Sequence, residues 1–301
     1  MDRDEIVRAW HYLRFINECL RRTGTEFQSF FEDLMEKVDP AFVRIKPSGQ
    51  EGDWKSDGWL PGSGTCFQVY APEELTVATT VAKIEADFAG ALAKWNGDLK
   101  SWIFVWSARQ EGLPAAVLNC LNKLSEDNEE IEIDQWGRER LWQQCCELPE
   151  ADRTDLLGPV PEPAAVTATT DHEVQSLLTY IAEQPIPDLD SDLELVSLEE
   201  KMDRNDFGEG VRLLIKAAMP IVPTVEHYVS NHPDQRFSQR VAVSLGERYE
   251  EMTESLDGDA NAIFGGLLDR ISGAATPETK ERWAAVAIVA HYFELCDIFE
   301  R

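Results

Sequence analysis

Apolar residues recur every three or four positions in the first part of the chain. One such stretch runs from about 3 to 22 and includes Trp10, and a second runs from about 26 to 37 and includes Phe31. This spacing places apolar side chains on one face of a helix. Two amphipathic helices are therefore expected at the start of the chain.

Short apolar runs bounded by turn residues follow these helices. They lie at about 42–45, 54–60 and 66–71, and the last two are joined by a Pro-Gly-Ser-Gly sequence at 61–64. Runs of this kind are typical of strands, and the glycines favour a turn between them. The run S-W-I-F-V-W at 101–106 is continuously apolar, which indicates a strand buried on both faces.

Helical spacing returns between and after these strands. The expected helices lie at about 73–95, 113–124 and 136–146, with one more short strand at 131–133. Strands and helices in this order predict an α/β domain of three layers around a mixed sheet.

The pattern changes after residue 148. Residues 149–170 are rich in proline and small side chains and read as a linker, so the predicted domains are 1–148 and 171–301. The second domain is expected to be all-helical, because only helical spacing recurs in it. Its expected helices are 173–184, 194–203, 207–231, 236–255, 260–271 and 278–300.

Composition narrows the classes of function. The 301 residues include 56 Asp and Glu against 28 Lys and Arg, a formal net charge of −28. This charge disfavours non-specific binding to nucleic acid. The six cysteines form no C-x-x-C pair. No apolar run reaches the roughly 18 residues of a membrane span, and the N-terminus does not resemble a signal peptide. A cytoplasmic protein with reduced thiols and no membrane contact is expected.

The stretch from 49 to 74 carries the candidate chemistry. Gln68 interrupts the apolar run C-F-Q-V-Y, and Asp57 lies across a glycine-rich turn from it. A buried amide must be hydrogen-bonded or bound to a ligand, because otherwise its burial costs free energy. Phosphodiester cleavage with a divalent cation needs oxygen ligands of this kind and a group that stabilises charge.

The order of these residues resembles that of PD-(D/E)XK nucleases. In that family a helix is followed by a β-hairpin with Asp on one strand and an acid or Gln, one residue, then Lys on the next. Asp57 and Gln68-Val69-Tyr70 resemble this arrangement, with Gln as in the Mrr-like branch. The resemblance implies a restriction-endonuclease-like mixed sheet. It also implies Mg²⁺ or Mn²⁺ held by Asp57 and Gln68, with Glu26 as an auxiliary ligand.

The departure from that pattern is Tyr70, which stands where the family has Lys. Tyrosine has an ordinary pKa near 10 and supplies no permanent positive charge. Positions 68 and 70 of a strand point to the same face. Lys83, in the following helix, is expected to supply the missing charge to the catalytic group of Asp57, Gln68 and Tyr70. Lys55 is the alternative, nearer in sequence but in a turn.

Structural readings of the same residues remain open. Asp57-Gly58 is also an ordinary turn dipeptide, and Gln68 is also a core amide satisfied by the backbone. Lys83 and Asp87 are four residues apart, which is the spacing of a solvated ion pair on a helix.

The stretch that contains Asp57 and Gln68, and a second stretch near the end of the sequence, resemble one family. G-D-W-K-S-D-G-W with F-Q-V-Y-A-P-E is similar to the nuclease-type region of bacterial three-component conflict systems, which include Lamassu-type anti-phage defence. A-A-V-A-I-V-A-H-Y-F-E-L-C-D-I-F-E is similar to the C-terminal helix of their effector subunits. The resemblance implies an endonuclease acting on double-stranded DNA. It also implies that the helical domain binds an SMC/Rad50-like ABC ATPase and a middle component, and that the active form is a homo-oligomer.

Three hypotheses follow from the sequence. The first is a metal-dependent DNA endonuclease effector. The second is a non-catalytic module that keeps the nuclease scaffold without its lysine, and the third is a regulatory scaffold without DNA contact. The position of Lys83 relative to Asp57 and Gln68 distinguishes the first two.

Overall fold

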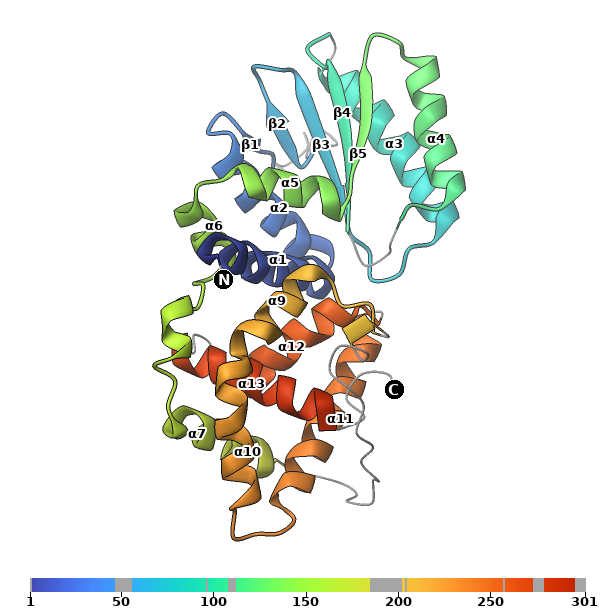
Figure 1. The fold of residues 1–301 in the computed structure, drawn as a ribbon. Helices are drawn as coiled ribbons and strands as arrows, with labels where there is room; N and C mark the ends of the chain where they lie inside the picture. Colours follow the sequence, from blue (N-terminus) through green and yellow to red (C-terminus); the bar gives the residue numbers. More distant parts are fainter. Residues whose placement is uncertain are drawn as a thin grey trace. The chain divides into compact units, whose positions relative to one another are not determined.

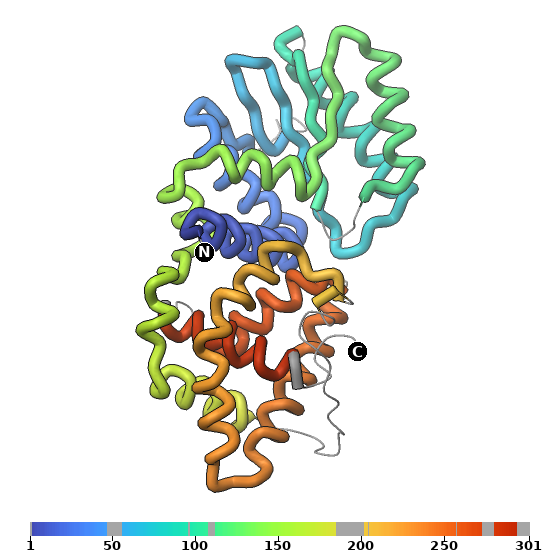
Figure 2. Tube along the Cα trace, viewed as in Figure 1, coloured from blue at the N-terminus to red at the C-terminus, as the bar shows by residue number. Residues whose placement is uncertain are grey.

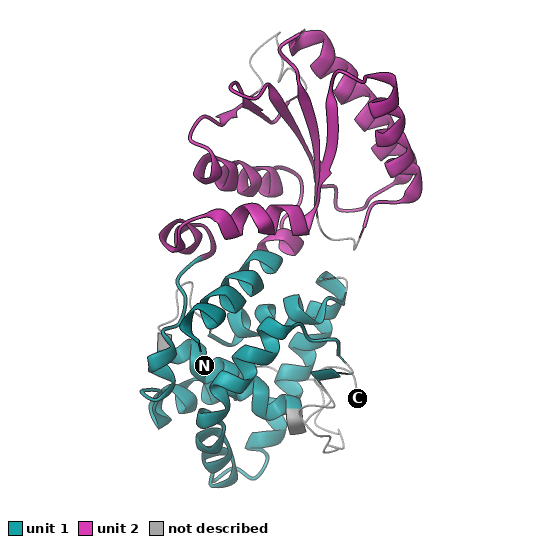
Figure 3. Ribbon diagram, turned by 45° about the horizontal axis from the view of Figure 1, so that its top comes forward, with its two compact units in different colours: residues 1–17, 158–301 teal, residues 18–157 magenta. Residues whose placement is uncertain are grey.

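The chain divides into two compact units. The computed structural model describes residues 2–46, 56–95, 97–107, 112–184, 202–203, 205–256, 258–272 and 279–295. One unit comprises residues 18–157, and the other comprises residues 1–17 with 158–301 (Figure 3).

A five-stranded mixed sheet forms the centre of the unit of residues 18–157 (Figure 1). Its strands lie in the order of the sequence. They are β1 (Val43–Arg44), β2 (Gly58–Leu60), β3 (Thr65–Tyr70), β4 (Ser101–Trp106) and β5 (Glu132–Trp136). β1, β2 and β3 are antiparallel, whereas β3, β4 and β5 are parallel. The prediction of a mixed α/β fold is confirmed.

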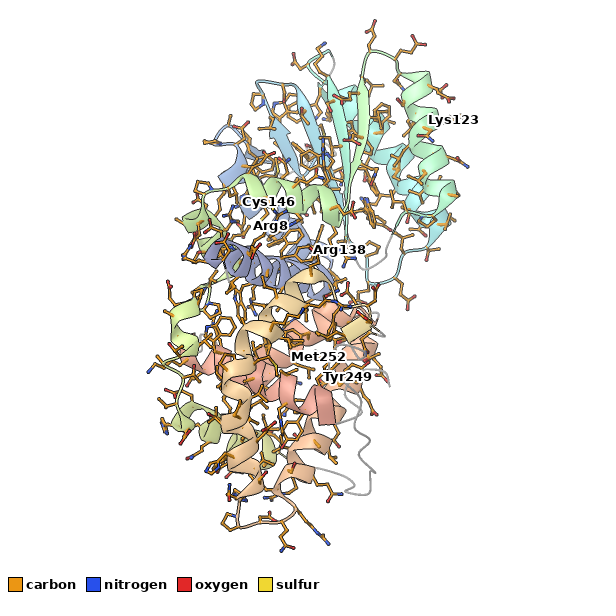
Figure 4. All side chains as sticks on the ribbon, viewed as in Figure 1. Arg8, Lys123, Arg138, Cys146, Tyr249 and Met252 are labelled. Carbon is orange, nitrogen blue, oxygen red and sulfur yellow. The ribbon has the colours of Figure 1, made fainter. Side chains whose placement is uncertain are left out.

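Helices cover both faces of this sheet. α2 (Gly24–Val38) and α5 (Arg138–Glu147) lie on one face, and α3 (Val77–Trp95) and α4 (Ala115–Asp127) lie on the other (Figure 1). The labelled Lys123 extends from the outer side of α4, and Cys146 lies on α5 (Figure 4).

Side chains of β3 alternate between the two helical layers. Phe67 points to the layer of α2, where its ring centroid lies 5.5 Å from that of Phe31 and 5.4 Å from that of Trp136. Cys66 and Tyr70 instead belong to the apolar cluster formed with α3 and α4. Because strand residues alternate in direction, Gln68 also points to the α3 side.

Every residue of β4 is buried, as the sequence predicts. Trp102 packs edge-on against Phe88 of α3, with 5.5 Å between ring centroids. The strand is parallel to both of its neighbours and is covered by helices on both faces. This environment explains why the sequence of β4 is continuously apolar.

A helix lies within the stretch predicted to be a linker. α6 (Glu150–Leu157) begins directly after Pro149, and Lys37 of α2 pairs with its Asp155 at 2.5 Å. Proline is tolerated at the start of a helix, where its missing N–H has no intrahelical partner. A short 3₁₀ helix, η2 (Pro163–Val166), follows in the same stretch.

In the other unit, every regular element within the described residues is a helix. Besides the first part of α1 (Arg3–Arg21) and η2, its elements are α7 (Asp171–Ala182), α9 (Glu209–Ala218), η3 (Met219–Ile221), α10 (Val222–Ser230), α11 (Phe237–Ser255), α12 (Ala260–Ser272) and α13 (Thr279–Leu295). α13 contacts α7, α9, α10 and α12 (Figure 2). Its side chains from Trp283 to Phe293 are almost fully buried, as expected for a helix that is apolar on all sides.

The predicted helix across 207–231 is divided in the structure. α9, η3 and α10 occupy this stretch, and Pro220 and Pro223 lie at the division. Proline removes a backbone donor and clashes with the preceding turn, so a continuous helix is disfavoured there. The predicted helix at 194–203 lies outside the described residues except for 202 and 203.

Residues 1–17 were expected in the domain of residues 1–148, but in the structure they belong to the helical unit. Close contacts with α12 explain this difference. A Cβ added at Gly265 of α12 would lie 2.1 Å from Nδ2 of Asn17. Arg14 also pairs with Asp269 of α12. A similar approach joins α12 to α11, where a Cβ at Gly266 would lie 2.8 Å from the sulfur of Met252, which Figure 4 labels. Glycine therefore permits both close approaches to α12.

Burial of His291 predicts a loss of stability at acid pH. Burial in α13 lowers the pKa of His291 from 6.5 to about 4. Between these two pH values the unfolded chain therefore binds more protons than the folded chain. The contribution of neutral His291 to the free energy of unfolding is present above pH 6.5 and is lost as the pH falls toward 4. The shift corresponds to about 3 kcal/mol.

Urea unfolding of wild-type and His291→Gln protein at about pH 7 and about pH 4.5 measures this effect. The free energy of unfolding of the wild type should fall by about 2 kcal/mol more than that of the variant. Equal losses in the two proteins would show that His291 does not titrate as described.

No helix in the described ranges has the length and apolar character needed to cross a bilayer.

Candidate functional site

Asp57 lies directly before β2 and continues its pairing. Its backbone N–H donates to the carbonyl of Phe67 at 2.8 Å, and its carbonyl accepts from the N–H of Ile45 at 3.3 Å. The residue is 9% exposed. Asp57 is therefore fixed in the sheet between β1 and β3, and is not at the tip of a turn.

Gly58 is required by the packing beside Asp57. It pairs with Phe67 in the antiparallel ladder of β2 and β3. A Cβ at this position would lie 2.3 Å from the ring of Phe42. The Asp-Gly sequence therefore reflects this close approach to an aromatic ring rather than a turn dipeptide.

Gln68 and Asp57 contact each other across the hairpin of β2 and β3. Gln68 Nε2 donates to Asp57 Oδ2 at 2.8 Å, and the backbone N–H of Val69 donates to the same oxygen at 2.7 Å. Gln68 is 6% exposed, and its Oε1 has no hydrogen-bond partner among the residues that the structure describes. A buried acceptor without a partner costs about 1–3 kcal/mol. This oxygen is therefore available to a ligand beside the Asp57 carboxylate.

Cys66 lies next to these residues but is not a nucleophile. Its Sγ donates to Ser56 Oγ at 3.2 Å, and Ser56 Oγ donates to the carbonyl of Gly58 at 2.9 Å. Burial raises the pKa of the Cys66 thiol to about 12, and the charges of Asp57 and Asp87 add to this rise. The thiol therefore stays protonated at neutral pH.

Lys83 of α3 lies beside Tyr70, the residue that stands where the nuclease motif has lysine. Its Nζ donates to Asp87 Oδ2 at 2.6 Å and lies 5.6 Å from the centroid of the Tyr70 ring. The Asp87 side chain is 3% exposed and that of Lys83 is 35% exposed. The pair is therefore not the solvated surface pair that the sequence also allowed.

Glu26 lies in a different environment. The N–H of Gly24 donates to the carbonyl of Ala71 at 2.6 Å, so the first turn of α2 meets the end of β3. Glu26 follows in this turn and is exposed, and its helix covers the face of the sheet to which Phe67 points. Its part in metal binding stays a prediction.

From the sequence, Asp87 was expected only as the partner of Lys83 in a solvated pair, and Ser56 was not expected in this group. A signal for Asp87 was present, because it lies on the same stripe of α3 as the buried residues Ile84, Phe88 and Ala91. A carboxylate on such a stripe must have a partner inside the protein. Ser56 had no comparable signal, since its hydrogen bond to Cys66 depends on the fold of the hairpin.

The residues present fit a hard divalent cation in part. Within the described ranges, no group of three His, Cys, Asp or Glu side chains is arranged to hold a metal ion. Mg²⁺ prefers oxygen ligands and is often bound by one or two carboxylates together with water and substrate phosphate. The Asp57 carboxylate and the unpartnered Oε1 of Gln68 are oxygen donors of this kind.

Comparison with known proteins identifies the C-terminal part of the chain. Residues 172–300 match the family described as C-terminal domain 10 of the ABC-three component (ABC-3C) systems. No curated protein and no solved structure matches the chain. The predicted resemblance of the C-terminal part to three-component systems is therefore confirmed, and no comparison identifies the N-terminal part as a nuclease.

Proposed function

We propose that this chain, a component of an ABC-3C system, is the nuclease effector of that system in anti-phage defence. The unit of residues 18–157 would hydrolyse phosphodiester bonds of double-stranded DNA with Mg²⁺ or Mn²⁺. The observation that supports this function is the buried, unpartnered Oε1 of Gln68 beside the carboxylate of Asp57.

Each side chain of the site has a distinct part in this proposal. Asp57 and Gln68 would hold the cation, which when bound stabilises the negative charge that develops on the phosphate. Lys83 would add its positive charge to the same phosphate, as a fixed cation does in phosphoryl transfer. Tyr70 would support the Lys83 ammonium with the face of its ring.

The helical unit would connect the nuclease to its partners. The ABC-3C domain implies association with the other components of the system. We infer that these are an SMC/Rad50-like ABC ATPase and a middle component. A partner that holds DNA would offset the formal charge of −28, which disfavours DNA binding by this chain alone. Oligomerisation of the active form is part of the same proposal.

One observation favours a second candidate, a non-catalytic module of the same system. Asp57 Oδ2 already accepts two N–H donors, and Lys83 is paired with Asp87. Charged groups with such partners also occur in purely structural networks. In this alternative the unit would serve in assembly of the complex or in recognition of DNA, and its residues would catalyse no reaction.

Substitution of Gln68 tests the proposed nuclease. Gln68→Met removes the amide oxygen and should lower DNA cleavage by at least about 100-fold, whereas Gln68→Glu keeps an oxygen and should retain most of the activity. The assay uses the full chain with the other components of its system, plasmid DNA and Mg²⁺. Phage plating on cells that express the system provides a second readout.

Gln135→Met is the matched control. Gln135 is an amide of β5 whose Oε1 accepts from the indole N–H of Trp106 at 2.6 Å. Its substitution also removes a partly buried amide but should leave cleavage unchanged. Wild-type cleavage and protection by Gln68→Met would rule out a catalytic cation at this residue and favour the non-catalytic module.

A further inference from the structure

We propose that Asp87 is a positioning residue that holds the Lys83 ammonium at the candidate site, an inference that rests on the proposed nuclease function. Asp87 would act through Lys83 and would not touch DNA itself. Neither the nuclease motif nor the family match assigns a part to this residue.

The position of Asp87 in α3 requires a partner inside the protein. Ile84, Phe88 and Ala91 share its buried stripe, and the Asp87 side chain is 3% exposed. An ionised carboxylate in such surroundings is retained only when it is paired and hydrogen-bonded. The 2.6 Å contact from Lys83 Nζ provides a charge-assisted hydrogen bond of this kind.

A second contact fixes the same ammonium from the sheet. Lys83 Nζ lies 5.6 Å from the ring centroid of Tyr70, within the range of a cation–π interaction. Tyr70 is two residues beyond Gln68 on the same face of β3. The ammonium is therefore held between a carboxylate of α3 and a ring of β3, on the side of the sheet to which Gln68 points.

The two carboxylates of the group lie on this same side. Asp57 contacts Gln68 across the hairpin, and Asp87 contacts Lys83 from the helix. Asp57 Oδ2 also accepts the backbone N–H of Val69, which directly precedes Tyr70 on β3. The charges that the proposed reaction uses therefore gather around one segment of β3.

This arrangement gives Asp87 a defined effect on catalysis. A free lysine side chain samples many rotamers, and a fixed charge aimed at a phosphate needs no reorganisation during the reaction. Loss of Asp87 would leave the positive charge present but no longer held in place. The effect is therefore expected in kcat rather than in KM.

Four proteins test the inference: wild type, Asp87→Asn, Lys83→Ala and the double variant, each as the full chain with the other components of its system. Asp87→Asn should lower kcat for DNA cleavage by about 10- to 100-fold with KM nearly unchanged. The double variant should be no slower than Lys83→Ala alone, because Asp87 acts only through Lys83. A further drop in the double variant would show a structural role and overturn the inference.

Glu18→Gln is the matched control for the loss of an acidic partner. Glu18, in the last turn of α1, pairs with Arg22 at the same spacing of four residues, and both belong to the unit of residues 18–157. Its kcat should equal that of the wild type. Tyr70→Leu provides a second variant of the site if Asp87→Asn folds poorly, and it should lower kcat through the same lysine.

Chemical labelling tests the positioning without the reaction. Reductive methylation of lysines, followed by mass spectrometry, should modify Lys83 about 10-fold faster in Asp87→Asn than in the wild type. Unchanged labelling of Lys83 would overturn the inference whatever the cleavage assay gives. If the wild type shows no cleavage but Lys83 is labelled faster in Asp87→Asn, the proposed nuclease function would be overturned. Asp87 would then remain the residue that positions Lys83.

Discussion

Replacement of Asp57 by asparagine is expected to abolish DNA cleavage and phage protection while the protein stays folded. Asparagine keeps a side-chain oxygen that accepts from Gln68 Nε2 and the N–H of Val69, as the Asp57 carboxylate does. It removes the negative charge that the proposed cation requires. We expect cleavage to fall by at least about 1000-fold, measured with the full chain, its partner components and Mg²⁺.

Asp134→Asn is the matched control for this substitution. The Asp134 carboxylate also accepts a backbone N–H, from Gln135 at 2.8 Å, and a side-chain N–H, from Trp136 at 3.3 Å. It belongs to β5, at the edge of the sheet away from the β2–β3 hairpin. Its substitution should leave cleavage unchanged. Equal activity of Asp57→Asn and Asp134→Asn would contradict the assignment of Asp57.

The largest loss of stability is expected for Phe67→Ala. Phe67 is 1% exposed, and its ring contacts those of Phe31, Phe42 and Trp136 at centroid distances of 5.5, 5.9 and 5.4 Å. Truncation removes buried apolar surface and leaves a cavity, at a cost of about 3–5 kcal/mol.

Urea unfolding followed by far-UV circular dichroism measures this cost. Val43→Ala in β1 provides the control, because Val43 is 44% exposed and its truncation should change stability by less than about 0.5 kcal/mol. A cost below about 1 kcal/mol for Phe67→Ala would show that the aromatic cluster does not hold α2 against the sheet.

The elements with the strongest patterns were predictable from sequence. β4 follows from its continuous apolar run, because a strand buried on both faces has no polar face to interrupt that run. The alternation of strands and helices likewise led to the mixed sheet. α6 was missed because proline and small residues in its vicinity are also typical of linkers, and its pairing with Lys37 is a tertiary contact.

The candidate site was predictable only in part. The contact between Asp57 and Gln68 follows from their spacing on either side of a tight hairpin. The burial of Asp87 and the place of Lys83 over Tyr70 depend on how α3 packs on β3, which local sequence does not specify. The requirement for glycine at 58 depends in the same way on the ring of Phe42.

The acidity of the chain is consistent with a nuclease that depends on its partners. With 56 acidic and 28 basic residues, the chain alone repels DNA at long range. In the proposed function, a partner that holds DNA nearby would supply the positive charge that this chain lacks. This division would also prevent cleavage of DNA by the isolated chain.

Binding of Mn²⁺ to the full chain, followed by electron paramagnetic resonance, tests most directly whether Asp57 and Gln68 form a cation site. The wild type and Asp134→Asn should bind the ion at the same affinity, whereas Asp57→Asn should bind it at least about 100-fold more weakly. Equal binding by wild type and Asp57→Asn, or no binding by the wild type with DNA present, would contradict the proposed metal-dependent nuclease.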